Sequence, residues 1–389
     1  MKQQKIHRNV WVLGLGSLLT DVSSEMIHSL LPLFLVSVLG ASVLTVGLIE
    51  GLAEATASSL KVFSGGLSDY LGQRKGLLVA GYGLSTFVKP LFALATSPLW
   101  VLIARFGDRV GKGIRVAPRD ALIADVTDLS NRGAAYGLRQ SLDTIGAFLG
   151  PLAAFSLMAI SQQHFRLVFW LALIPGVMAV TLLALGVKEP SAKASQTKTN
   201  PLRWATLQSL SRGYWILVVV ALLFNLGNSS DAFLLLKAEQ AGIPTPMVPL
   251  TLVVMNIAYS LSAYPVGVLS DRVSRVKLLV GSFLLYALVY LGFAFVQAPW
   301  QVWALFAFYG LYLGMSQGVL LALVADRVPS HLRGTAFGFL NLAVGVALLP
   351  ASILAGGLWQ LMGSGAAFTM GSVFAVTAAL LLITQGSKN

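Results

Sequence analysis

The chain has 389 residues, of which 56% are hydrophobic and 11% are charged, with no cysteine and a formal net charge of +12. A mean hydropathy of +0.78 is typical of a protein with many membrane-spanning segments and excludes an ordinary water-soluble domain. Without cysteine, the chain has no disulfides, thiolate metal sites or thiol nucleophiles.

The apolar segments predict an all-α polytopic membrane protein, because about 20 apolar residues cross a hydrocarbon layer of roughly 30 Å. Twelve transmembrane helices are predicted. In chain order they cover residues 10–38, 45–66, 75–96, 98–118, 134–158, 165–187, 214–236, 247–269, 276–297, 299–324, 335–357 and 364–384.

Basic residues are distributed unevenly between the two predicted faces of the membrane. Most Lys and Arg lie on one face, whereas the loops of the other face hold only Arg166 and Lys237. The positive-inside rule therefore predicts an inner-membrane (plasma membrane) protein with both termini in the cytoplasm. The net charge is interpreted as an orientation signal, and no nucleic-acid partner is expected.

Two sequence landmarks recur along the chain. Asp69 matches Asp271 at an offset of 202 residues, and Asp125 matches Asp326 at an offset of 201 residues. Nearly equal offsets predict two parallel six-helix repeats around a central cavity, an arrangement found in transporters. The predicted domains are an N-terminal six-helix bundle at 1–187, a cytoplasmic linker at 188–213 and a C-terminal six-helix bundle at 214–389.

The loop after the second predicted span carries a family signature. Gly66-Leu-Ser-Asp-Tyr-Leu-Gly-Gln-Arg-Lys75 resembles the loop signature of the major facilitator superfamily, and residues 267–277 resemble its weaker second copy. Arg105, with two glycines after it, is similar to the fourth-span signature of that family. The resemblance covers essentially the whole chain and implies a transporter that works by alternating access.

The fifth predicted span holds a second signature. Gly146-Ala-Phe-Leu-Gly150-Pro151 resembles the Gly-x-x-x-Gly-Pro pattern of proton-driven exporters in the same superfamily. Small residues at this spacing also occur wherever membrane helices pack closely. Helix packing is therefore assigned to Gly146, Gly150 and Pro151.

The resemblance also implies a conformational latch in the signature loops. Asp69 would meet the positive end of the helix dipole at the start of the eleventh span and hold the outward-open state. Topology-setting loop charges are the alternative interpretation. The latch residues inferred from the resemblance are Gly66, Asp69, Arg74, Lys75, Asp271 and Arg272.

Charged residues inside the predicted spans are candidate functional groups, because burying them in lipid is costly. Burial favours the protonated form of a carboxyl group and a nearby arginine favours the ionised form, so an arginine that moves would drive proton exchange. Asp21 and Glu25 share a helix face with His28, which is left out because a lone His at a helix end is more often a polar rim residue. The alternative is a static ion-pair network. Proton coupling is assigned to Asp21, Glu25, Glu54, Asp108 and Asp143.

Basic and amide side chains are the candidates for substrate binding. Arginine holds a carboxylate or phosphate by a two-pronged fork, and lysine does so as a point charge. Amide and hydroxyl groups of the C-terminal half could face the same cavity. The substrate-binding candidates are Arg105, Arg109, Lys112, Arg139, Asn225, Asn228, Asp231, Asn256 and Tyr259.

These features predict a monomeric, proton-coupled antiporter that exports a small organic anion or zwitterion. A proton symporter that takes up an organic anion is the first alternative. A non-transporting membrane sensor or scaffold is the second, although it would predict an additional soluble domain. An enzyme is not expected, because the spans hold no His-Glu-x-x-His motif and no Ser-His pair. No cofactor or metal is expected, and the partners are a small-molecule substrate, protons and lipid.

Overall fold

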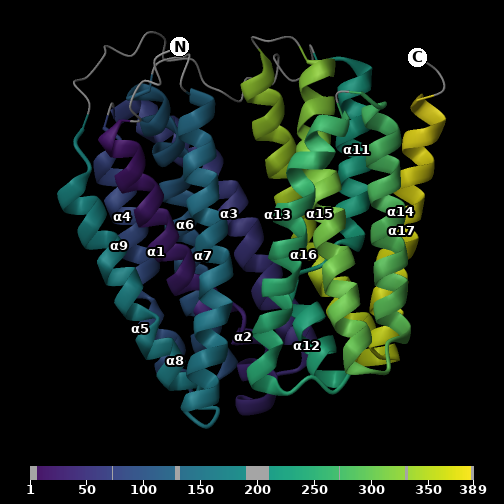
Figure 1. Cartoon of the computed structure of the whole chain (residues 1–389), viewed down its shortest axis with the longest axis horizontal. Coiled ribbons are helices and arrows are strands. Elements are labelled where there is room, and N and C mark those ends of the chain that lie inside the picture. Colours follow the sequence, from purple (N-terminus) through teal and green to yellow (C-terminus); the bar gives the residue numbers. More distant parts are fainter. Residues whose placement is uncertain are drawn as a thin grey trace. The chain divides into compact units, whose positions relative to one another are not determined.

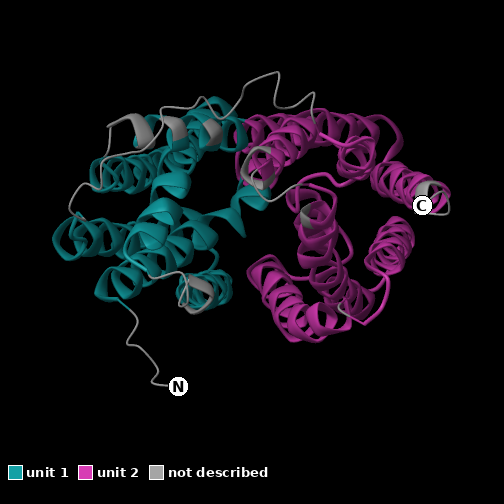
Figure 2. Cartoon of the chain, turned by 90° about the horizontal axis from the view of Figure 1, so that it is seen from above, with its two compact units in different colours: residues 1–34, 56–200 teal, residues 35–55, 201–389 magenta. Residues whose placement is uncertain are grey.

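The computed structural model describes residues 7–71, 73–127, 132–189, 210–270, 272–328 and 332–386, and their regular structure is helical throughout. The chain forms two compact units, shown in different colours in Figure 2. Unit 1 comprises 1–34 and 56–200, and unit 2 comprises 35–55 and 201–389. The predicted boundary at 188–213 stays a prediction, since most of that segment lies outside the described residues.

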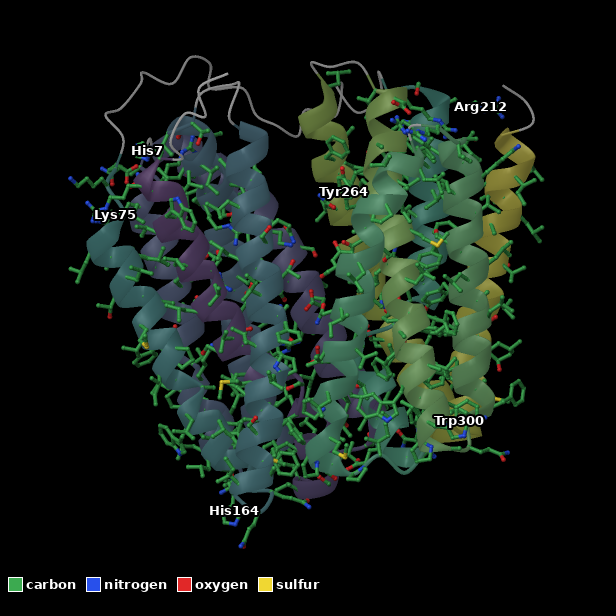
Figure 3. All side chains as sticks on the ribbon, in the orientation of Figure 1. His7, Lys75, His164, Arg212, Tyr264 and Trp300 are labelled. Atoms are coloured by element: carbon green, nitrogen blue, oxygen red, sulfur yellow. The ribbon has the colours of Figure 1, made fainter. Side chains whose placement is uncertain are left out.

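Unit 1 contains the helices of the first half of the chain (Figure 1). They are α1 (Arg8–His28), α2 (Leu31–Leu33), the C-terminal part of α3 (Val43–Leu71), α4 (Lys75–Phe87), α5 (Lys89–Leu94), α6 (Pro98–Asp125), α7 (Arg132–Ile160), α8 (Phe165–Leu171) and α9 (Leu173–Gly186). The ends of this unit are marked in Figure 3 by His7 and Lys75 on one side and His164 on the other.

Unit 2 contains the N-terminal part of α3 and the helices of the second half of the chain. They are α11 (Arg212–Gly227), α12 (Ala232–Gln240), the 3-10 turn Thr245–Met247, α13 (Val248–Ser270), α14 (Arg275–Phe295), α15 (Pro299–Arg327), α16 (Arg333–Met362) and α17 (Ser364–Gly386). A short π-helix, Phe34–Val38, precedes α3.

The described residues include 11 helical stretches that are long and apolar enough to cross a membrane. The remaining predicted span is α6, which has 28 residues but carries many charges. The all-helical fold predicted from the sequence is therefore confirmed. The predicted span ends at residue 118, and the helix α6 continues beyond it, through Pro118 to Asp125; packed neighbours let membrane helices tolerate an internal proline.

The two units repeat one packing pattern. In unit 1, α4 packs on α6 and α9, and α1 packs on α7 and α9. In unit 2, α14 packs in the same way on α15 and α17, and α11 packs on α16 and α17. An ion pair recurs as well, because Arg74 lies 3.2 Å from Asp125 and Arg275 lies 2.5 Å from Asp326. The predicted pair of parallel repeats is confirmed by these equivalent contacts.

The close crossing of α4 and α6 depends on Gly81. A Cβ added at Gly81 would lie 2.7 Å from the Gly111 carbonyl oxygen and 2.9 Å from the Arg115 backbone nitrogen, and neither backbone atom can yield. Gly81→Ala is expected to lower the free energy of unfolding by about 1–3 kcal/mol, measured by denaturant titration in detergent. Gly83→Ala on the same helix is the control, since nothing lies within 4 Å of its added Cβ. Equal losses for both variants would contradict this account of the crossing.

Candidate functional site

The charged residues of unit 1 come together because α6 packs tightly on its neighbours through glycine. A Cβ at Gly111 would lie 2.8 Å from the Ser85 backbone nitrogen of α4, and one at Gly113 would lie 3.2 Å from the Ala57 carbonyl oxygen of α3. Such close approach leaves the long charged side chains of α6 only a few directions in which to extend. Several of them extend to α1.

His28, at the last position of α1, lies at the centre of this charged group. Its Nδ1 is 3.6 Å from Glu25 Oε1, and its Nε2 is 3.5 Å from Asp108 Oδ2. Arg105 Nη1 hydrogen-bonds to the same Nε2, and Arg109 Nη2 lies 3.4 Å from Nδ1. Each ring nitrogen therefore faces one carboxylate and one guanidinium group. We call these five residues the His28 cluster.

The α6 members of the His28 cluster are almost completely buried. Asp108 Oδ2 lies 3.9 Å from Arg105 Nη1 and 3.8 Å from Arg109 Nε, and the three side chains are each 4% exposed. Glu25 differs, because 32% of its side chain is exposed. Within the cluster, Asp108 is thus placed as a counter-ion, and Glu25 is the carboxylate within reach of a ligand.

The Gly-x-x-x-Gly-Pro segment of α7 packs against the acidic face of α1. A Cβ at Gly146 would meet the Leu18 carbonyl oxygen at 2.7 Å and Asp21 Cβ at 2.8 Å. A Cβ at Gly150 would meet Glu25 Cβ at 2.5 Å. The two glycines therefore set the positions of both α1 carboxylates, and Pro151 lies one residue further along the same helix.

A second charged cluster lies further along α6 and α7. Arg139 is 3.2 Å from Asp143 and 3.4 Å from Asp120, and Arg119 is 3.0 Å from Asp120. Asp21, by contrast, has no hydrogen-bond or ion-pair partner among the described residues, although Asp143 acts on it electrostatically. Arg115 and Lys112 also act on Asp21 electrostatically, without a direct contact among the described residues.

The remaining candidates of the first half are placed differently. Lys112 is half-buried on α6 and acts electrostatically on Asp21 and Glu25. Glu54, on the N-terminal part of α3, belongs to unit 2.

Two residues of unit 1 lie among these charges although the sequence prediction did not assign them to the site, namely His28, whose side chain is 13% exposed, and the buried Lys89. Lys89 is 1% exposed, and its Nζ bonds to the hydroxyls of Ser23 and Ser24 on α1. Its position at the first turn of α5, just before Pro90, marks the break between α4 and α5. The sequence signal was available, since Lys89 is a lone base in an otherwise apolar span.

The candidates of the second half lie in unit 2. Asn228 and Asp231 bound the interruption between α11 and α12, and Tyr309 hydrogen-bonds to Asp231 at 2.9 Å. Asn225 instead donates to its own helix, at the Ala221 carbonyl oxygen. Tyr259 on α13 donates to Gln317, and Asn256 is half-buried one turn before it.

The predicted latch is only partly described. Arg74 pairs with Asp125, and the backbone N–H groups of Arg74 and Lys75 donate to the Glu189 carboxylate at 2.8 and 2.7 Å. Asp271 lies outside the described residues, and so do the side chains of Gly66 and Asp69. Arg272 is exposed. Arg275, which the latch prediction did not include, forms an ion pair with Asp326.

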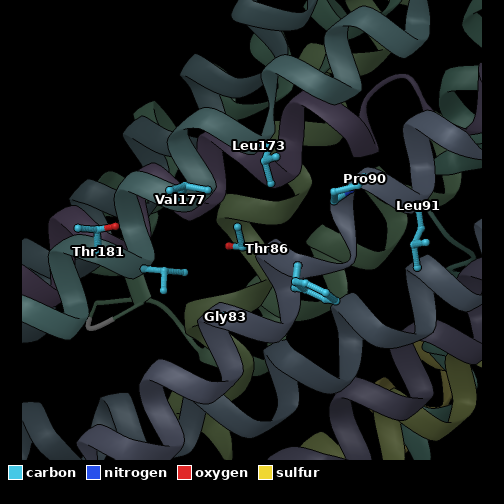
Figure 4. Close-up of a pocket in the computed structure, with 9 residues that line it drawn as sticks. Gly83, Thr86, Pro90, Leu91, Leu173, Val177 and Thr181 are labelled. Atoms are coloured by element: carbon cyan, nitrogen blue, oxygen red, sulfur yellow. The ribbon is translucent and has the colours of Figure 1, made fainter.

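An apolar pocket lies apart from these charges, between α4, α5 and α9 (Figure 4). Its volume is about 640 Å³, and its walls include Gly83, Thr86, Leu173 and Val177. The Thr86 hydroxyl is already bonded to the Gly176 carbonyl oxygen at 3.3 Å. With no charged residue in its walls, the pocket does not contribute to the site described above.

Comparison with known proteins agrees with the helical repeats. The family model of the Major Facilitator Superfamily matches residues 13–249 and 232–388. An uncharacterized MFS-type transporter of Methanocaldococcus jannaschii is 32% identical over 386 residues, which are 98% of this chain and 95% of that one. The multidrug resistance protein MdtG of Citrobacter koseri is 27% identical over 347 residues, 85% of this chain and 83% of that one.

A solved structure shows the same fold. The crystal structure of a POT family transporter in complex with a thioalcohol conjugated peptide superposes with a TM-score of 0.82 at 11% identity, over 98% of this chain and 96% of that chain. Members of the matched family are membrane transporters and not enzymes. This chain belongs to the Major Facilitator Superfamily and is a multi-pass secondary transporter.

Proposed function

We propose that the chain is a proton-coupled antiporter that exports a small organic anion or zwitterion from the cell. The observation that carries the proposal is the His28 cluster, in which each ring nitrogen of one imidazole faces one carboxylate and one arginine. Proton exchange is assigned to Glu25, Asp21 and His28. Arg109 and Arg105 are assigned to the negative group of the substrate.

The cost of burial argues against a purely structural cluster. Buried ion pairs seldom repay the desolvation of their charges compared with apolar side chains of similar size. Asp108, Arg105 and Arg109 are each 4% exposed, so all three charges are desolvated. Ionisable groups at such positions in membrane proteins usually belong to substrate or proton pathways.

The position of His28 provides two alternative bonding states. A neutral ring nitrogen can accept a hydrogen bond from an arginine, and a protonated one can donate to a carboxylate, but one nitrogen cannot do both. A proton on His28 therefore favours bonds to Glu25 and Asp108 and releases Arg105 and Arg109. Histidine changes charge near physiological pH more readily than any other side chain. Proton binding and the availability of the arginines are thereby linked.

The direction of coupling depends on which substrate group meets Glu25. A substrate with a hydrogen-bond donor competes with the proton for this carboxylate, and competition produces antiport. A plain anion on the arginines would instead favour protonation of the neighbouring acids, and this electrostatic argument supports symport as the second candidate. The relationship to MdtG, whose name describes a multidrug resistance protein, supports export.

Proton exchange on substrate binding tests the proposal. A thermal-shift screen of the purified protein against metabolites and drugs identifies a ligand, since one present at 100 times its Kd adds about 2.7 kcal/mol. Binding of that ligand in weakly buffered detergent is then expected to release protons, and the affinity is expected to rise with pH. Proton uptake on binding would favour the symporter. Binding without any transport by reconstituted protein would favour a sensor.

A further inference from the structure

Unit 2 contains a membrane span that is interrupted by polar residues. The apolar stretch Arg212–Gln240 is long enough to cross a membrane, but α11 ends at Gly227 and α12 begins at Ala232. The interruption is Asn228-Ser-Ser-Asp231. Backbone at membrane depth leaves the helical conformation only where protein groups or a water-filled cavity satisfy it. In transporters, interrupted helices of this kind commonly form ion and substrate sites.

A buried tyrosine orients the carboxylate of the interruption. The Tyr309 hydroxyl donates to Asp231 Oδ1 at 2.9 Å and lies 3.5 Å from Asn228 Oδ1. Tyr309 is 2% exposed, whereas the Asp231 side chain is exposed. The carboxylate is thus held in a fixed direction by a buried group and remains accessible to a ligand.

A second tyrosine, Tyr290, places its hydroxyl near the same residues, where this hydroxyl makes no hydrogen bond of good geometry with any described residue. Tyr290 is 1% exposed, and its hydroxyl has no hydrogen-bond partner of acceptable geometry in the described part of the chain. Ser229, Tyr286 and Tyr309 nonetheless lie within hydrogen-bonding reach of this hydroxyl, and Asp231 acts on it electrostatically. Stacking on Tyr286 at 4.1 Å between ring centroids fixes its position. Buried hydroxyls almost always have a partner, so this one calls for a ligand.

The groups gathered at the interruption are hydrogen-bond acceptors with one negative charge. They are a carboxylate, an amide oxygen and the oxygens of serine and tyrosine hydroxyls. A primary ammonium group has three donors and no acceptor, and its bond to a carboxylate is charge-assisted. We propose that the interruption at Asn228–Asp231 binds a protonated amine of the transported compound, through Asp231 and the Tyr290 hydroxyl. The inference rests on the proposed transport function and makes the substrate a zwitterion rather than a plain anion.

Three probes with one ring and different charges test the inference. They are 2-phenylethylamine, 2-phenylethanol and phenylacetate, each titrated against purified full-length protein while the thermal unfolding midpoint is recorded. The amine is expected to raise the midpoint of the unmodified protein and the alcohol is expected to have little effect. Asp231→Asn, which keeps the shape and removes the charge, is expected to weaken amine binding about tenfold or more and to leave phenylacetate binding unchanged.

Tyr290→Phe separates a ligand role from a structural one. Its hydroxyl makes no hydrogen bond of good geometry within the described residues, so the midpoint without probe is expected to change little. Amine affinity is expected to fall several-fold. Tyr264→Phe is the matched control, because the Tyr264 side chain is 80% exposed on α13.

Three results would overturn the inference. They are no stabilisation by the amine, stabilisation that survives Asp231→Asn, or stabilisation by sodium chloride alone that Asp231→Asn removes, which would indicate a metal-ion site. None of these results bears on phenylacetate binding or on proton coupling in unit 1, which are tested by separate experiments. Amine binding that depends on Asp231, in a protein that shows no proton exchange, would support this site and contradict the proposed antiport.

Discussion

Glu25→Gln is expected to abolish transport driven by a pH gradient while ligand binding remains measurable. The substitution keeps the shape and the polarity of the side chain but replaces the carboxyl group, which exchanges a proton, by an amide, which does not. Glu25 is the member of the His28 cluster with 32% of its side chain exposed, and it lies 3.6 Å from His28. The measurement compares uptake into proteoliposomes with and without a pH gradient, using the ligand found by the thermal-shift screen.

The control for this variant is Glu239→Gln. Glu239 belongs to unit 2 and lies near the end of α12, where its carboxylate accepts a hydrogen bond from Thr245. This variant is expected to transport normally. Unchanged pH-driven transport by Glu25→Gln would remove Glu25 from the coupling role, whereas loss of binding together with transport would indicate a structural role.

Arg109→Ala is expected to weaken binding of anionic ligands by about 10- to 100-fold, the usual effect of losing a charged hydrogen bond. Neutral ligands should lose far less. Arg109 is 4% exposed and lies 3.4 Å from His28 and 3.8 Å from Asp108, so its guanidinium group is part of the His28 cluster that would hold a carboxylate. The measurement compares the affinities for phenylacetate and for a neutral ligand found by the thermal-shift screen, in the variant and in the unmodified protein.

Two further variants control the arginine prediction. Arg109→Lys retains the charge without the planar fork and is expected to recover only part of the phenylacetate affinity. Arg166→Ala removes a base that donates to the Ala95 carbonyl oxygen and is expected to change neither affinity. Equal losses for the anionic and the neutral probe in Arg109→Ala would identify Arg109 as part of a structural ion pair.

Most of the fold could be predicted from the sequence, because each membrane-spanning helix is visible as an apolar stretch long enough to cross the bilayer. The length of α6 was harder to predict, because the span was placed at 98–118 and the helix continues through Pro118 to Asp125. Tertiary packing decides such cases. The interruption at Asn228–Asp231 was also missed, because hydropathy averages over four polar residues in a long apolar stretch.

The candidate site was harder to predict because it depends on contacts between helices. Asp21, Glu25 and His28 share a face by helical spacing alone, yet only the structure places both ring nitrogens of His28 between acids and arginines. Periodicity within one helix carries no information about the rotation of its neighbour. For the same reason Asp108, predicted as a proton carrier, is found buried between two arginines.

The central claim is that substrate moves against the proton. Proteoliposomes prepared with an acidic lumen and diluted into alkaline buffer drive protons outward, and the opposite preparation drives them inward. The account predicts that labelled substrate accumulates inside the vesicles with an acidic lumen and not in the opposite preparation. Accumulation only in vesicles with an alkaline lumen, where substrate would move together with the proton, would contradict it.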